Sequence, residues 1–419
     1  MDTMKDIGID QTKSTNNYTF KKVVQGKPYT KKNYVLKNIF RSLAIISLLA
    51  AFIIGKTWNR IDYHSFLSEK LHNTNLLKID EQTYYYEDSD HTLTYFPLGK
   101  ERGYGGALTV ATNINNEGII DNIIVMEHNE TVSFFNKITN RGFFKQFIGR
   151  NISDALIEDQ DIDIISGATI SSVAFAKAIR TSSHKIGIDY YGFSYPVESV
   201  IYSLGIKDLL LFILFALSIW AIYSGKKSIR YMALGLSLVS LGFYFNSALS
   251  ISHFGGLLLG QLPSFHSSIF IWLLLFGTIG FAFITKKNVY CHSMCPFHAV
   301  EVILVKIGGF KISFPKKLQK PIRNTSNMLL WSSLLIIFLA DNPTIAAFEP
   351  FAMIFGLEGV GIQWYILPAV LVGILFITDF FCRYFCPVGR SFKYIIEIRR
   401  WIDRNLISRS YPILKKNKK

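Results

Sequence analysis

Six apolar stretches constrain the fold of this 419-residue chain more than any other feature of its sequence. The hydrocarbon core of a bilayer is about 30 Å thick, and roughly 20 residues of helix cross it. Half of the residues are hydrophobic, which favours a membrane protein over a soluble enzyme. We therefore predict a multi-pass α-helical membrane protein with six spans, near residues 38–58, 206–224, 231–251, 267–285, 327–345 and 362–381. The first span is interpreted as an uncleaved anchor, because no small-x-small cleavage site follows it.

The distribution of positive charge predicts how these spans are oriented. The formal net charge is +15, and Lys and Arg gather in both terminal tails, in the turn at 225–230 and in the loop at 286–324. The loops at 252–266 and 341–361 contain neither residue. The positive-inside rule then places both termini in the cytoplasm and residues 59–200 outside the cytoplasmic membrane. Nucleic acid is not an expected partner, because the basic residues flank apolar runs.

The expected domain organisation follows from the spans. It consists of a cytoplasmic basic tail (1–37), span one (38–58), an extracytoplasmic domain (59–200), a five-span membrane domain (201–390) and a second cytoplasmic basic tail (391–419). The extracytoplasmic segment predicts a small α+β domain. Alternating apolar residues indicate strands at 83–88, 92–98, 107–114 and 118–128, and a helix is expected from about Ile170 to Arg180.

A run of small residues, Ser166-Gly167-Ala168-Thr169, stands immediately before that expected helix. Ser and Thr at such a joint often cap a helix, and Gly-Ala permits a tight turn. The same position also suits a phosphate, because a helix N-terminus offers unpaired N–H groups and a partial positive charge. The residues by themselves leave both roles open.

The wider motif, from Asp163 to Ser171, resembles the flavinylation motif of the FMN-binding domain. This family includes subunits of the sodium-pumping quinone reductase, of the Rnf complex and of NosR-type proteins, and the resemblance covers most of 103–180. It implies FMN carried covalently on Thr169 through a phosphoester bond, installed by a flavin transferase. It further implies that Ser166, Gly167 and Ala168 form the phosphate turn and that the transferase requires Asp163.

The resemblance also marks Glu130 and Thr131 as residues near the flavin. Many family members continue this pair with Pro-Gly in a loop over the ring, whereas Val132 and Ser133 follow it here. The departure leaves the conformation over the ring open.

All four cysteines fall in two copies of Cys-x-x-x-Cys-Pro, namely Cys291 with Cys295 and Cys382 with Cys386. The predicted topology places both copies at cytoplasmic ends of spans, where a reducing compartment disfavours disulfides. Soft thiolate ligands suit an iron–sulfur cluster, and we expect a 4Fe-4S type. A closed zinc site with four thiolates is the alternative. One shared cluster and two incompletely ligated clusters both agree with the sequence.

Several charged residues are further candidates. Lys286, Lys287 and Arg383 lie near the cysteines in sequence and are expected to offset the charge of the cluster. Glu349 stands in an otherwise apolar outer loop, where a carboxylate is a candidate for proton handling during quinol oxidation. His253 and His266 are candidates for lining a quinone pocket.

The layout as a whole resembles the NosR/NirI group of membrane flavoproteins. In length it is most similar to the RdhC type (the PceC/CprC group), which is encoded beside reductive dehalogenases. The resemblance implies a redox carrier or quinol-oxidising subunit that takes electrons from menaquinol or a cytoplasmic donor and passes them to an exported reductase. The rival interpretation is a maturation or regulatory factor for an exported metalloenzyme. With cluster and flavin on opposite sides of the membrane, a carrier such as bound menaquinone is expected between them.

Overall fold

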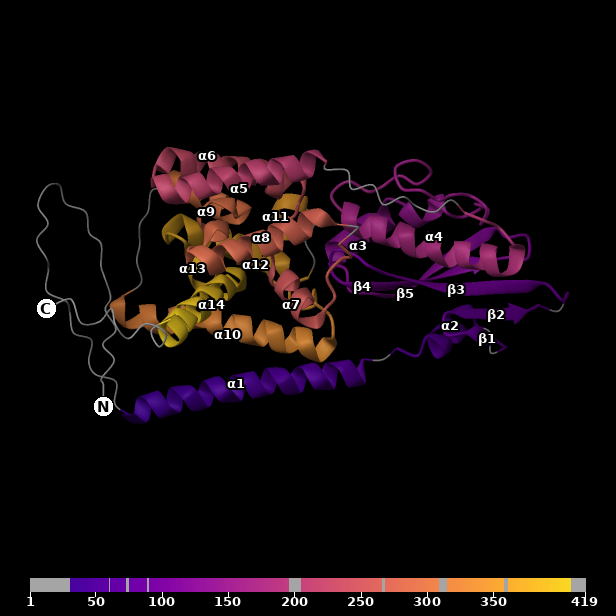
Figure 1. Ribbon diagram of the computed structural model, residues 1–419, viewed down its shortest axis with the longest axis horizontal. Coiled ribbons are helices and arrows are strands. Elements are labelled where there is room, and N and C mark those ends of the chain that lie inside the picture. The colour runs from indigo at the N-terminus through magenta and orange to yellow at the C-terminus, as the bar shows by residue number, and fades with distance from the viewer. Residues whose placement is uncertain are drawn as a thin grey trace, which may run out of the picture. The chain divides into compact units, whose positions relative to one another are not determined.

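The computed structural model describes residues 31–59, 61–72, 75–88, 90–195, 205–265, 268–308, 315–357 and 361–407 (Figure 1). The chain divides into two compact units, residues 1–50 and 51–419. The described part of the first unit is helical throughout and forms the beginning of α1 (Lys31–Trp58). All contacts described below lie within the second unit.

The first part of the second unit is built on a five-stranded antiparallel sheet with the strands in sequence order (Figure 1). Its elements are α2 (Tyr63–Leu71), β1 (Leu77–Asp80), β2 (Thr83–Glu87), β3 (Leu93–Arg102), β4 (Ala107–Ile114), β5 (Ile120–His128), α3 (Val132–Asn140), the 3-10 helix η1 (Phe143–Gln146) and α4 (Thr169–Tyr191). The predicted strands at 83–88, 92–98, 107–114 and 118–128 are confirmed as β2 to β5. The helix expected at 170–180 exists and continues to Tyr191.

Alternation along the strands gives the sheet an apolar layer on each face. On one face, Leu108 and Val110 pack with residues of α4 such as Phe175. On the other, Phe96 and Ala111 join the α2 side chains in a smaller cluster. Helix α4 approaches β3 very closely, since a Cβ at Gly99 would lie 1.9 Å from the carbonyl oxygen of Ala178. This close packing fixes the middle of α4 against β3.

The remainder of the second unit is helical. It contains α5 (Ile206–Ser224), α6 (Lys227–Ser237), the π-helical segment η2 (Leu238–Tyr244), α7 (Ile251–Leu259), α8 (Ile269–Thr285), the π-helical turn η3 (Tyr290–Met294), α9 (Pro296–Gly308), α10 (Lys316–Ala340), α11 (Phe351–Gly356), α12 (Gln363–Phe376), α13 (Phe380–Tyr384), α14 (Pro387–Ile402) and η4 (Asp403–Ile407). Helix α9 packs against α6 and α12, and α14 packs against α8 and α10.

Two of the described helices are both long and apolar enough to cross a bilayer, Asn38–Trp58 and Ile206–Ser224. Three shorter apolar helices, Ile269–Thr285, Asn324–Ala340 and Gln363–Phe376, coincide with three further predicted spans. Much of the apolar surface of α5 is exposed, including Leu209 and Phe212, which suits contact with hydrocarbon. The topology of six spans stays a prediction.

The stretch 231–251 differs from the continuous helix expected there. Helix α6 passes into η2, and residues 245–250 form an irregular segment before α7 begins. Asn246 in this segment has a left-handed backbone (φ 46°). The polar residues Asn246, Ser247 and Ser250 interrupt the apolar run, and their side chains offer local alternatives to helical hydrogen bonding. The break brings the backbone of this segment into contact with Tyr104 of the sheet domain and with Tyr290, which precedes the first cysteine motif.

Candidate functional site

The Thr169 turn forms the start of α4. Gly167 has a left-handed backbone (φ 78°), Ala168 occupies the N-cap position and Thr169 is the first helical residue. The Ser172 hydroxyl accepts a hydrogen bond from the Ile165 N–H (3.3 Å) and donates to the Ala168 carbonyl (3.0 Å), which ties the turn together. The cap position therefore belongs to Ala168, and the half-buried Thr169 side chain stands at a helix N-terminus where an anion is stabilised.

A lysine from α3 lies over this turn. A Cβ added at Gly167 would come within 2.9 Å of the Lys137 Nζ atom, so the ammonium group is in direct proximity to the turn. Lys137 is 32 residues from Thr169 in the chain, and no sequence motif joins them. A cation at this point adds to the helix dipole in favouring a phosphate.

Glu130 is buried beside the same helix start. One of its carboxylate oxygens accepts hydrogen bonds from the Ser171 hydroxyl (2.6 Å) and from the Gly105 N–H (3.2 Å). The other oxygen, Oε1, has no hydrogen-bond partner among the described residues. Burial raises the pKa of Glu130 from 4.5 to about 7, although the two hydrogen bonds act in the opposite direction. The group therefore titrates near neutral pH, and its hydrogen-bond partner Ser171 is two residues from Thr169.

The segment after Glu130 forms a helix in place of a loop. The carbonyl of Thr131 accepts hydrogen bonds from the N–H groups of Phe134 (2.9 Å) and Phe135 (3.1 Å), and α3 begins at Val132. Phe135 stacks on His128 with ring centroids 3.8 Å apart. An aromatic surface thus lies where the family places its covering loop.

Two residues of the expected motif, Asp163 and Ser166, are exposed. Asp163 is exposed and is held through its backbone, whose N–H and carbonyl both pair with the Gln146 side chain (2.8 and 3.1 Å). Ser166 is also exposed. Their accessibility suits recognition by another protein, as the resemblance implies for Asp163.

The residues around Thr169 fit an FMN group. Three buried polar atoms near the start of α3 and α4 have no hydrogen-bond partner in the described structure, namely Glu130 Oε1, Ser133 Oγ and His128 Nδ1. A buried polar atom left unpaired costs about 1–3 kcal/mol. A ligand with several hydrogen-bonding atoms and a phosphate satisfies this arrangement.

The four cysteines meet at one cavity of about 320 Å³. Cys295 and Cys386 are buried, and Cys291 and Cys382 are half-buried. The sequence left open whether the two motifs form one site or two. Because all four thiols line the same cavity, they fit one shared centre with four thiolate ligands.

Both cysteine motifs have the same local structure. A short helical segment, η3 or α13, is followed by an extended cysteine, and the next residue is the proline that begins a longer helix. The motifs are therefore not simple helical turns with thiols at i and i+4. The Gly389 N–H donates to the Cys386 sulfur (3.4 Å), and Cys295 directly precedes the first residue of α9. The N-termini of α9 and α14 thus face sulfur atoms, which favours negative charge there.

Positive side chains line the cavity, but only one of the three that we expected from the sequence is among them. Arg383 is present, together with Arg390 and Lys393. Lys286 instead forms an ion pair with Asp403, and the Lys287 ammonium lies over the Tyr223 ring at 4.6 Å. The expectation was wrong for these two lysines because the sequence between α8 and η3 turns them toward η4 and α5.

A buried carboxylate joins the two motifs. Glu301 of α9, which follows the first motif, accepts hydrogen bonds from the N–H groups of Phe381 (2.8 Å) and Cys382 (3.3 Å) in the second. The His298 imidazole lies 3.8 Å from its other oxygen. The ligand atoms of His298, Glu301 and Cys382 lie within 4.8 Å of one another, so this side of the cavity offers further metal ligands.

Two other candidates, Glu349 and His253, lie at the start of α7, where the irregular segment ends. Glu349 is buried and accepts a hydrogen bond from the Ile251 N–H (2.7 Å), and its second oxygen has no partner among the described residues. His253 is buried, and its ring meets that of Tyr104 edge to face, with centroids 4.8 Å apart. His266 lies outside the described residues.

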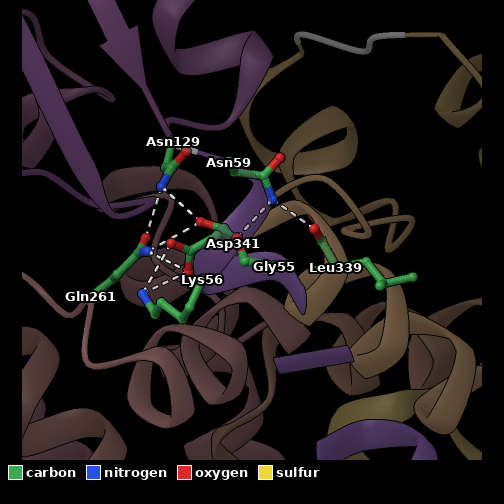
Figure 2. Close-up of polar contacts among 7 residues, drawn as sticks. All are labelled: Gly55, Lys56, Asn59, Asn129, Gln261, Leu339 and Asp341. Carbon is green, nitrogen blue, oxygen red and sulfur yellow. Dashed lines mark hydrogen bonds and ion pairs between the residues drawn. The ribbon is translucent and has the colours of Figure 1, made fainter. Parts of the chain in front are cut away.

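A polar cluster connects the sheet domain to the helical domain (Figure 2). The Asn129 side chain donates to Gln261 Oε1 (2.7 Å), and the Gln261 amide donates to the carbonyl and the carboxylate of Asp341 (both 3.1 Å). Lys56 forms an ion pair with Asp341 (2.8 Å). Asn129 directly precedes Glu130, so this cluster holds the edge of the candidate flavin site against the helices.

Residues 103–183 match the family model of the FMN-binding domain. The chain is 26% identical to protein NirI of Paracoccus denitrificans over 193 residues (42% of this chain, 28% of NirI). It is 26% identical to the putative electron transport protein YccM of Escherichia coli over 146 residues (32% of this chain, 40% of YccM). It is also 26% identical over 106 residues to one component of the proton-translocating ferredoxin:NAD(+) oxidoreductase complex of Clostridium ljungdahlii (24% of this chain, 57% of that component).

The part of the chain that contains the Thr169 turn is thus an FMN-binding domain. The matched segments span less than two thirds of each of these relatives. Together, the matches show that the chain is similar to FMN-binding proteins of the NosR/NirI type.

Proposed function

We propose that this protein is a membrane-bound electron-transfer protein with FMN on Thr169 and an iron–sulfur centre held by four cysteines. The observation that carries the proposal is the convergence of all four thiols on one cavity in a chain that also contains an FMN-binding domain. Two redox groups in one chain suit a carrier better than a binding module. The names of two relatives, an electron transport protein and a component of an oxidoreductase complex, agree with this role.

The chain's own residues would hold both groups. Thr169 would carry the flavin phosphate, with Lys137 and the start of α4 stabilising its charge, while Glu130 lies close enough to exchange a proton with the site. Cys291, Cys295, Cys382 and Cys386 would ligate the metal, with the N-termini of α9 and α14 and three cationic side chains offsetting the thiolate charge. When bound, the two groups supply one-electron and two-electron redox chemistry.

The proposed orientation places the sheet domain outside the cytoplasmic membrane. The two loops without Lys or Arg are the ones that approach this domain, through Gln261 and Asp341. This agreement between charge distribution and contacts supports placing the sheet domain and both loops on the same side of the membrane. The proposed electron source is the quinone pool, with menaquinol as substrate, or a cytoplasmic donor, and the proposed acceptor is an exported reductase. On layout, a reductive dehalogenase is the proposed acceptor.

Flavin and metal content test the central proposal. Full-length protein coexpressed with a flavin transferase should show in-gel flavin fluorescence and the corresponding added mass, and Thr169→Ala should lack both. Anaerobic protein should contain iron and acid-labile sulfide, and serine variants of the cysteines should lose them. Fluorescence that persists in Thr169→Ala refutes the attachment site. Zinc in place of iron refutes the electron-transfer role of the cysteine site.

Quinol oxidation is tested at Glu349, which has a buried and unpartnered oxygen. Glu349→Gln keeps an acceptor for the Ile251 N–H but cannot take up a proton. We expect normal flavin and iron content with slower reduction by a menaquinol analogue. An unchanged rate rules out this role for Glu349.

The second candidate function is maturation of an exported metalloenzyme, in which the flavin would serve cofactor assembly. The exposed Asp163 and Ser166 near the flavin site leave room for a protein partner in either case. Deletion of the gene separates the two. A reductase that is mature but lacks electron supply supports the carrier, whereas a reductase without its cofactor supports the maturation factor.

A further inference from the structure

A single peptide group lies between two tyrosine hydroxyls, one from each candidate site. The Tyr104 hydroxyl of the FMN-binding domain donates a hydrogen bond to the Ala248 carbonyl (3.3 Å). The N–H of the same peptide group, that of Leu249, donates to the Tyr290 hydroxyl (2.8 Å). The peptide belongs to the irregular segment between η2 and α7, and the break in that helix is what makes both of its polar atoms available.

The Tyr290 end of this connection reaches the metal cavity. Tyr290 immediately precedes Cys291, is fully buried and lines the cavity together with Leu249. Its backbone carbonyl accepts a hydrogen bond from the Cys295 N–H (2.8 Å), and its ring stacks on Phe392 of α14 (5.7 Å between centroids). Tyr290 is therefore held between the Leu249 N–H and the first cysteine motif, at the wall of the metal cavity.

The Tyr104 end reaches the flavin site. The neighbouring Gly105 N–H donates to Glu130, which in turn accepts from Ser171, two residues after Thr169. The ring of Tyr104 also packs edge to face on Phe134 of α3 (5.2 Å). The pKa of the Tyr104 hydroxyl is raised, first by burial and then by the carboxylates of Glu130 and Glu349, so the hydroxyl stays protonated and remains a donor.

Both hydrogen bonds point in the same direction, from Tyr104 through the peptide to Tyr290, whose main chain continues directly into Cys291. Hydrogen bonds aligned in this way polarise one another. Electronic coupling through covalent and hydrogen-bonded contacts is stronger than coupling across empty space of the same length. The connection contains two side chains and one peptide group, and none of its parts has to move.

We propose that the Tyr104–peptide–Tyr290 bridge is the electronic connection between the iron–sulfur centre and the flavin. It rests on the proposed function, and it removes the need for a mobile carrier between the two groups. Each transfer moves one electron, so that one centre is oxidised by one unit while the other is reduced by one unit. A quinol supplies two electrons and two protons when it is oxidised to the quinone, and two transfers with two protons complete the reduction of FMN.

Tyrosine-to-phenylalanine variants of the full-length, cofactor-loaded protein test the bridge, because they remove only the hydroxyl groups. Tyr104→Phe should keep wild-type flavin and iron contents and the same reduction potential of the iron–sulfur centre. The rate of electron exchange between the two groups after flash photoreduction should fall about tenfold. Tyr191→Phe is the matched control, since its hydroxyl also donates to backbone carbonyls, those of Asn115 and Asn116, within the FMN-binding domain.

Tyr290→Phe gives a second, spectroscopic readout. Loss of the Tyr290 hydroxyl beside the cavity should shift the potential of the centre, because the polarity and hydrogen bonding around a cluster help set it. Amide hydrogen exchange of Leu249 should accelerate even in protein without cofactors. The double variant should exchange electrons no more slowly than the slower single variant, because both hydroxyls act in one path.

The outcomes separate this inference from the proposed function. Wild-type protein that takes up neither flavin nor iron contradicts the proposed function itself. Tyr104→Phe with full cofactor content and a wild-type exchange rate overturns the bridge and leaves the proposed function intact. Additive slowing in the double variant also overturns a single path.

Discussion

Several residues at the Thr169 turn each contribute to the proposed anion site. Gly167 supplies the left-handed backbone and leaves space for the Lys137 ammonium, while Ala168 leaves the cap position free of a polar side chain. The positive end of α4 and the lysine act on the same point. A phosphate attached to Thr169, as we propose, would therefore be stabilised by charges from two different elements.

Removal of the Lys137 charge should reduce flavin attachment. We expect Lys137→Ala to lower the flavinated fraction several-fold in a timed reaction with the transferase, because a phosphate loses a charge-assisted partner. Lys137→Arg should retain most of the attachment. The flavinated fraction is measured from the intact mass. Lys145→Ala, in an exposed position on η1, is the control and should match wild type. Equal attachment in Lys137→Ala and wild type contradicts a phosphate contact.

The raised pKa of Glu130 predicts how the stability of the protein depends on pH. The unfolded chain ionises this group near pH 4.5 and the folded chain near 7. Over that interval the unfolded state releases the proton first, so the free energy of unfolding decreases as the pH rises. A shift of this size corresponds to at most about 3 kcal/mol.

Glu130→Gln should therefore stabilise the cofactor-free protein above pH 7 and have little effect near pH 4.5. The midpoint of thermal unfolding, measured from pH 4.5 to 8 in detergent, reports the difference between variant and wild type. Glu127→Gln is a suitable control, since this neighbouring carboxylate is only partly buried. A difference that is constant with pH would show that Glu130 titrates at its ordinary value.

The sequence pointed to the residues that we propose to carry the chemistry, but not to the residues that support them. Thr169 and the four cysteines stand in short motifs, where local spacing determines the geometry. Lys137 and Tyr104 act on those motifs from other elements. Whether each one reaches its motif depends on how α3 and the loop after β3 pack. Such contacts leave no periodic or local signal in the chain.

At the scale of elements, the two cysteine motifs are equivalent units that face one cavity. Each has a short helical segment, an extended cysteine and a helix that begins with proline. The sequence showed the repeat, but it did not show that both units share a site, because that depends on the packing of α9, α13 and α14. Glu301 is the contact that links the two units directly.

Loss of the Glu301 carboxylate should separate the motifs and reduce metal binding. Glu301→Leu leaves the buried N–H groups of Phe381 and Cys382 without their acceptor, at a cost of about 1–3 kcal/mol each. We expect the iron content to fall by more than half. Glu301→Gln keeps an acceptor oxygen and should retain most of the iron, and Glu397→Leu on α14 serves as the control. Full iron content in Glu301→Leu would show that the cysteines are positioned without this contact.

At the scale of the second unit, the FMN-binding domain is fixed to the helical domain by polar contacts with very different surroundings (Figure 2). Asn129 and Gln261 are buried, at 5% and 9% exposure. The side chains of Lys56 and Asp341 remain 39% and 23% exposed. An exposed ion pair contributes roughly 0–1 kcal/mol, whereas a buried amide left unpaired costs about 1–3 kcal/mol. The hydrogen bond between the two amides should therefore matter more for docking than the ion pair.

Gln261→Leu should loosen the FMN-binding domain while keeping a similar volume, because the Asn129 side chain loses its shorter hydrogen bond and keeps only the one to the Asp341 carbonyl (3.3 Å). Amide hydrogen exchange in residues 103–106 and 129–131 should accelerate by roughly tenfold, which corresponds to about 1.4 kcal/mol. Lys56→Met removes the ion pair and should change exchange in the same residues by less than about threefold. If the bridge through Tyr104 depends on docking, Gln261→Leu should also slow electron exchange between the two groups, whereas Lys56→Met should not. A larger effect of Lys56→Met than of Gln261→Leu would mean that charge pairing, and not the buried amide contact, holds the flavin domain against the helices.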